Sequence, residues 1–94
     1  MSDRKVYDTS QIRSVGDQFT RASQDSQTLL TNLQNLVTNL QGSFTGVAAQ
    51  RFYSHFSDQA TQLRTYVHLY EDIGTELKQL ADRIESFDQA LITG

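Results

Sequence analysis

The two histidines are the residues of this chain best suited to chemistry near neutral pH, because imidazole titrates there and binds metal ions. Each has an acid within about one helical turn: Asp58 follows His55 by three residues, and Asp72 follows His68 by four. Such pairs ligate metals in helical bundles when they project inward and meet carboxylates from other helices. The heptad pattern below puts both histidines outside the apolar stripe, so we expect solvated histidines, with no metal ion and no cofactor.

Other catalytic chemistry has little support in the sequence. The chain has no cysteine, which excludes thiol nucleophiles and disulfides. Serine and aspartate are frequent, but no arrangement with histidine defines a catalytic triad. Gly42 and Gly46 are not followed by the Lys-Ser/Thr of a phosphate-binding loop. We therefore predict a protein that is not an enzyme and has no small-molecule substrate.

The charge pattern argues against several kinds of partner. The net charge is −3, and the basic residues are scattered along the chain. Nucleic acids and acidic membranes attract clustered cations, so neither is an expected partner. No apolar run approaches the ~20 residues that span a bilayer. Because Met1 to Ser10 are mostly polar, we also expect no cleaved signal peptide.

A long helix is predicted over about residues 8–41. Asp8 followed by Gln11 resembles a capping box, and the chain has no proline to interrupt a helix. With Ile12 as heptad position a, the a and d positions are apolar except for one serine: Ile12, Val15, Phe19, Ala22, Ser26, Leu29, Leu33, Leu36 and Leu40. The e positions Gly16, Ser23, Leu30 and Val37 widen this stripe.

A turn at residues 42–46 and a second long helix at about 47–91 follow. Gly42 is typical of a helix end, and Ser43 or Thr45 is suited to cap the next helix. With Ala49 as position a, the a and d residues are Ala49, Phe52, Phe56, Gln59, Leu63, Tyr66, Tyr70, Ile73, Leu77, Leu80, Ile84, Phe87 and Leu91. The e positions begin with Tyr53, Ala60, Val67 and Gly74.

The two stripes predict an all-α, antiparallel helix-turn-helix hairpin in a single domain, residues 1–94. Folding about the turn sets Leu33 against Phe56 and Phe19 against Tyr70, and the stripes stay in phase along the overlap. A two-helix seam needs only the a and d rows, so the e rows are expected to face outward. We expect a second hairpin to cover them in a four-helix bundle. The predicted dimer interface is Gly16, Ser23, Leu30, Val37, Tyr53, Ala60 and Val67.

The second predicted helix is longer than the first. Phe87 and Leu91 therefore have no opposite residue in the first helix and are predicted to form an exposed docking surface at the helix end. The alternative is that a partner hairpin covers both residues, because the ends of bundles are often staggered.

The central turn resembles that of a known family. The small helical hairpins of the WXG family, the early secreted antigen-like substrates of the type VII (ESX) secretion system, carry Trp-x-Gly there, and Phe44-Thr45-Gly46 occupies the matching place. Length, hairpin plan and turn position agree over about residues 8–91. The aromatic Phe44 is expected to plug the bundle end, while Gly46 lacks a Cβ where the next helix begins.

The resemblance implies a bacterial protein that is cytoplasmic before export and is then secreted without a cleaved signal. It also implies pairing with itself or with a homologous hairpin or effector protein, and recognition by the secretion ATPase. The family's Tyr-x-x-x-Asp/Glu export motif is missing. Ile84 and Asp88 are the nearest counterpart. The pattern favours a solvated terminal acid at Asp88, so a partner is an alternative carrier of the signal. The alternative function is an intracellular helical adaptor or coiled-coil dimerisation module unrelated to export.

Overall fold

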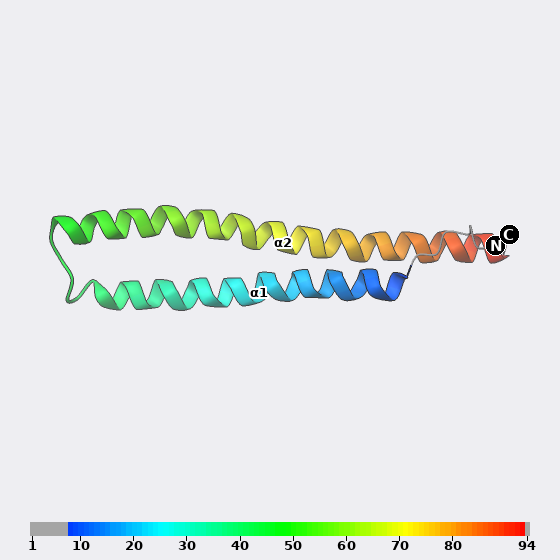
Figure 1. Cartoon of the computed structure of the whole chain (residues 1–94), viewed down its shortest axis with the longest axis horizontal. Helices are drawn as coiled ribbons and strands as arrows, with labels where there is room; N and C mark the ends of the chain where they lie inside the picture. The colour runs from blue at the N-terminus through cyan, green and yellow to red at the C-terminus, as the bar shows by residue number, and fades with distance from the viewer. Residues whose placement is uncertain (1–7, 94) are drawn as a thin grey trace.

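The chain folds into two long antiparallel helices joined by one short turn (Figure 1). The computed structural model describes residues 8–93, with side chains through Gln89. Helix α1 spans Thr9–Leu40 and helix α2 spans Val47–Thr93. They form a rod with extents of 71 × 21 × 17 Å and no strand among the described residues. The predicted hairpin is thereby confirmed, whereas a four-helix bundle remains a prediction.

Helix α1 begins at the predicted cap. The Asp8 carboxylate accepts a hydrogen bond from the Gln11 backbone N–H at 3.0 Å, which satisfies one of the free donors of the first turn. At the other end the Leu40 carbonyl accepts from the backbone N–H groups of Ser43 and Phe44, both at 2.9 Å. The turn residues therefore supply the hydrogen bonds for a carbonyl at the end of α1 that has no partner within the helix.

The turn requires glycine at position 46. The sequence suggested lack of space for a Cβ as the reason, whereas the structure points to the backbone conformation. Gly46 has a φ of +105°, which side chains with a Cβ rarely adopt, and it directly precedes α2. A Cβ built there would meet no atom within 4 Å, so its backbone conformation, and not lack of space, favours glycine. Gly42, expected as the helix-ending glycine, has no positive φ.

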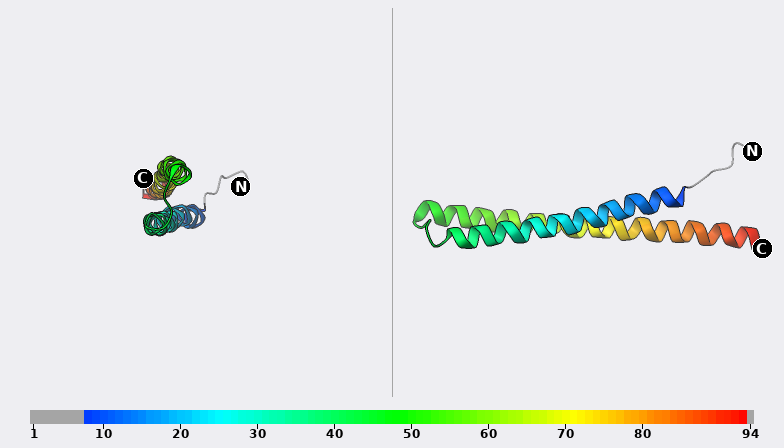
Figure 2. Two further views of the ribbon diagram at one scale, coloured as in Figure 1. Left: turned by 90° about the vertical axis from the view of Figure 1, so that its left-hand side faces the viewer. Right: turned by 90° about the horizontal axis from the view of Figure 1, so that it is seen from below.

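The seam between the helices is centred on the e rows, contrary to prediction. Leu30 and Val67 are 3% and 5% exposed within a single hairpin, and Gly16, Ser23 and Ala60 are also buried. The Ser23 hydroxyl donates a hydrogen bond of 2.9 Å to the Val67 carbonyl on the other helix. Small side chains let the two backbones approach, and this close approach decides which rows meet. The helices wrap around each other along the seam (Figure 2).

The two backbones approach each other closely at a pair of glycines. A Cβ on Gly74 would stand 2.8 Å from the Gly16 carbonyl oxygen and 2.6 Å from the Thr20 hydroxyl oxygen. A Cβ on Gly16 would stand 3.1 Å from the Gly74 carbonyl oxygen. The predicted register holds at this level, because the rings of Phe19 and Tyr70 meet with centroids 6.3 Å apart.

Neither described helix has a stretch apolar enough to cross a bilayer. Both are amphipathic and carry polar side chains on much of their surface.

Candidate interaction surface

Large apolar side chains are exposed on one face of the hairpin, where the d positions of both helices lie. Because the helices are antiparallel and meet through their e rows, the d rows fall on the same side of the seam. We call this surface the apolar strip, and its members are Leu29, Leu36, Phe52, Tyr66, Leu80 and Phe87, which are 39–63% exposed. The half-exposed a-row residues Leu33 and Leu40 border it. A row of exposed large apolar side chains of this kind is typical of interaction sites.

The predicted dimer interface therefore needs correction. Gly16, Ser23, Leu30, Ala60 and Val67 are buried inside one hairpin, so a second molecule has no access to them. Val37 and Tyr53 are half-buried at the same seam. The prediction that more apolar rows exist than a lone hairpin covers holds, but the uncovered row is d instead of e.

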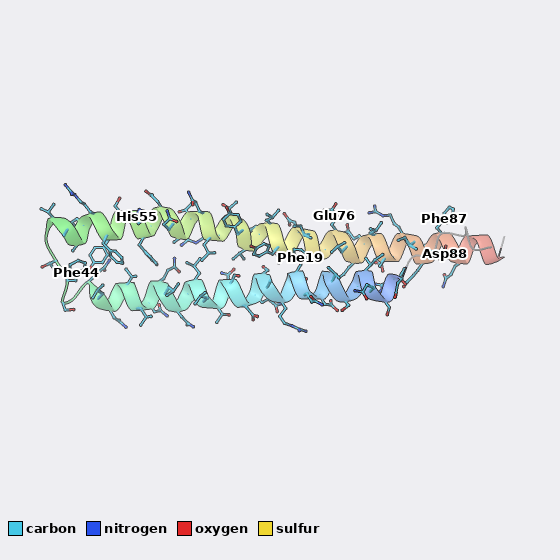
Figure 3. All side chains as sticks on the ribbon, in the orientation of Figure 1. Phe19, Phe44, His55, Glu76, Phe87 and Asp88 are labelled. Atoms are coloured by element: carbon cyan, nitrogen blue, oxygen red, sulfur yellow. The ribbon has the colours of Figure 1, made fainter. Side chains whose placement is uncertain are left out.

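Phe44 lies at the turn end of the hairpin (Figure 3). There it belongs to a cluster of aromatic side chains. Its ring centroid is 6.2 Å from that of Phe52 and 6.0 Å from that of Tyr53. The Tyr53 hydroxyl donates a hydrogen bond of 2.6 Å to the Phe44 carbonyl. The half-buried Phe44 ring thus packs on the start of α2 and fixes the direction in which the chain enters that helix.

The open end of the hairpin is joined by ion pairs on the face opposite the apolar strip. One Arg13 nitrogen lies 2.6 Å from a carboxylate oxygen of Asp82 and 2.6 Å from one of Glu85. Lys78 pairs with Asp17 at 3.0 Å. The hydrogen bond from Arg13 to Glu85, followed in importance by the one to Asp82, raises the pKa of Arg13 above its ordinary value. The Arg13 contact, assisted by Thr9, lowers the pKa of the Glu85 carboxyl.

These contacts predict a pH-dependent contribution to stability. Because the pKa of Glu85 is lower in the folded than in the unfolded chain, its stabilisation is complete above the unfolded value, and it is lost as pH falls through the folded value. Thermal unfolding of Glu85→Gln should show a lower midpoint than wild type at neutral pH. The difference should begin to shrink as the pH falls below about 4.3, the ordinary glutamate value, and should vanish only below the lowered folded-state value.

Glu76→Gln is the matched control for this experiment, because Glu76 is exposed on the same helix and has no ion pair among the described residues. Its difference from wild type should be small at every pH, as expected for an isolated surface charge. A Glu85→Gln deficit that persists unchanged at pH 2 would show that the lost contact is not ionic.

The remaining predicted site residues lie near the open end of α2. Ile84 is half-buried, and Asp88 is exposed beyond the start of α1 (Figure 3). Phe87 is 63% exposed, and the side chain of Leu91 lies outside the described ones. The structure does not test the export role of Ile84 and Asp88.

The histidines do not form a site with other side chains. His55 is exposed on the outer side of α2, and His68 is exposed with one ring nitrogen 3.9 Å from a Glu71 carboxylate oxygen. Among residues 8–89 no group of His, Cys, Asp and Glu side chains is arranged to hold a metal ion.

Sequence reasoning missed the outward direction of Leu29, Leu36, Tyr66 and Leu80. One signal for it was present: the e rows contain Gly16, Ser23, Ala60, Gly74 and Ala81, and small residues are typical of the line where two helices approach most closely. The small e-row residues therefore form the contact between the two helices of one hairpin. The bulky d residues lie beside that contact and are exposed to solvent.

Comparisons with known proteins agree with this architecture. Residues 6–89 match the family described as WXG100, proteins of 100 residues with WXG. No curated protein matches the chain in sequence. EsxA of Geobacillus thermodenitrificans, crystal form I, shares 21% identity and superposes with a TM-score of 0.85, over 92% of this chain and 96% of that one. The secreted protein EsxB of Bacillus anthracis strain Sterne also shares 21% identity, with a TM-score of 0.81 over 90% and 97% of the two chains.

Proposed function

This chain belongs to the WXG100 family, and on that premise we propose that it is a non-enzymatic substrate or targeting partner of a type VII secretion system. It works by pairing its helices with a second hairpin, which is either another copy or a homologous partner. The secreted protein EsxB of Bacillus anthracis has a similar fold, which supports the proposal that this chain is exported. Before export the chain is cytoplasmic, and recognition by the secretion ATPase belongs to the same proposal.

The observation that carries the proposal is the apolar strip. Each large apolar side chain that moves from water into an interface contributes about 1.5–3 kcal/mol. The strip runs along both helices, from Phe52 near the turn to Phe87 near the open end, so a second hairpin can cover it along its length. The product is a four-helix bundle in which the d rows form the new core.

The distribution of charge favours a second copy that runs in the opposite direction. Residues 26–50 contain no charged side chain, and the turn half adds only Arg51, Asp58 and Arg64. In the open half, α2 carries six acidic and two basic residues, whereas α1 carries two of each, so the open end is acidic as a whole. An antiparallel pair separates the two acidic ends, whereas a parallel pair would bring them together.

Export from a bacterial host tests the proposal. In a host with a type VII system the chain should appear in the culture medium, and it should remain in the cells when the system's membrane-bound ATPase is deleted. Equal retention in both hosts, in the presence of the chain's genomic neighbours, would favour the intracellular adaptor instead. The neighbours belong in the test because a partner is an alternative carrier of the export signal.

Asp88→Ala supplies the residue-level arm of this test. Because Asp88 is exposed and beyond α1, its removal should reduce export while leaving helicity by circular dichroism unchanged. Asp72→Ala is the matched control, since Asp72 is an exposed acid within the overlap of the helices. Unchanged export of Asp88→Ala would place the signal elsewhere or in a partner.

A further inference from the structure

A shallow groove opens between the helices on the face opposite the apolar strip, in the half nearer the turn. It has a volume of about 340 Å³. Its lining includes the apolar side chains of Val37, Phe56 and Ala60 and the polar side chains of Gln34, Gln41 and Arg64. Because a second hairpin on the apolar strip covers the other face, this groove remains open in a paired molecule.

Arg64 differs from the equivalent basic residues farther along the same face. Arg13 and Lys78 occupy the same heptad position, b, and each is paired with a carboxylate on the opposite helix. Among the described residues no ion pair joins Arg64 to a carboxylate. The α1 segment across from it has none to offer, because residues 26–50 carry no charged side chain. The Arg64 guanidinium is exposed and therefore available to a carboxylate of another molecule.

We propose that this groove binds a short acidic segment of a partner protein, in an extended conformation. A carboxylate of that segment pairs with the Arg64 guanidinium, whose planar fork suits a bidentate contact. The side-chain amides of Gln34 and Gln41 both donate and accept, so they are suited to hydrogen-bond the segment's backbone. A neighbouring apolar side chain of the segment covers Phe56 and Ala60. This surface is separate from the apolar strip and independent of export.

Selection from a random octapeptide library displayed on phage tests the proposal with the full-length chain as bait. Peptides enriched by the wild-type chain should share an Asp or Glu at one position. Their recovery should fall about tenfold or more on Arg64→Gln, the loss expected for one charge-assisted contact. Arg51→Gln is the matched control, because Arg51 is an exposed basic residue of the same helix that does not line the groove. It should retain the peptides.

Nitrogen-15 NMR with one enriched peptide and its Glu→Gln or Asp→Asn version locates the binding. The acidic peptide should shift the side-chain amide signals of Gln34 and Gln41, while the neutral version should leave them in place. No enrichment, enriched peptides without an acid, or equal recovery on Arg64→Gln would each overturn the proposal. Equal losses on Arg51→Gln and Arg64→Gln would overturn it as well, because they indicate general charge attraction.

Discussion

A chain carrying Leu36→Glu and Tyr66→Glu should be monomeric at concentrations at which the wild-type chain has twice its 10.7 kDa mass. Both side chains belong to the apolar strip and are 63% and 52% exposed, so the substitutions leave the seam within the hairpin intact. In a paired hairpin each new carboxylate would be buried without a partner. A cost of about 3 kcal/mol for each corresponds to a ~100-fold weaker dissociation constant per substitution. Native mass spectrometry or sedimentation equilibrium measures the change.

The matched control for the strip variant is Thr28→Glu with Thr75→Glu. It adds the same two charges to the same two helices, but at exposed positions outside the apolar strip. This control should keep both the dimeric mass and the helicity of wild type. If the strip variant loses helix as it dissociates while the control keeps both, pairing through the strip is still supported. A wild-type monomer, or a strip variant that remains dimeric, would contradict the assignment.

Gly74→Ala should lower the thermal midpoint, although alanine is the better helix former by about 1 kcal/mol. The new Cβ would stand 2.8 Å from the Gly16 carbonyl oxygen, so the two backbones must separate along the seam. Overpacking of this kind costs about 1–3 kcal/mol. After the propensity gain we expect a net loss of up to about 2 kcal/mol, which corresponds to a midpoint lower by up to roughly 15 °C in a domain of this size.

Two further variants separate the possible causes of that loss. Thr20→Ala in the Gly74→Ala background removes the contact at 2.6 Å but leaves the one with the Gly16 carbonyl, so it should restore only part of the stability. Gly42→Ala should be neutral or slightly stabilising, since its Cβ would meet only the Asn39 carbonyl oxygen, at 3.7 Å. A midpoint that rises in Gly74→Ala would show that helix propensity outweighs the close approach.

The sequence predicted the hairpin because its signals are local. Asp8 and Gln11 mark the start of α1, and the glycine-containing segment at 42–46 separates two heptad patterns. The register followed from counting outward from the turn, and the contact between Phe19 and Tyr70 confirms it. Each of these inferences depends on the spacing of residues along one chain, and this spacing is visible in the sequence itself.

Which row of each apolar stripe faces the other helix could not be predicted in the same way. A stripe of a, d and e positions is wide enough for the seam to lie on either side of its middle row. The choice depends on how closely two backbones can approach, which involves Gly16 and Gly74 together, and on the Ser23 hydrogen bond to the Val67 carbonyl. The groove at Arg64 was missed for a related reason: an unpaired charge is recognised only after the opposite helix is placed.

Apart from Leu30 and Val67, the fully buried residues of the seam in the lone hairpin have small side chains or none. Among the described residues no large side chain is completely shielded from solvent. An isolated copy thus encloses little apolar volume, and the side chains of the apolar strip are exposed. By mass action the folded population of such a chain rises with its abundance. In the proposed pair, a cell that makes too little of either chain would hold unpaired copies that are readily degraded, so the amount synthesised would set how much folded protein is present.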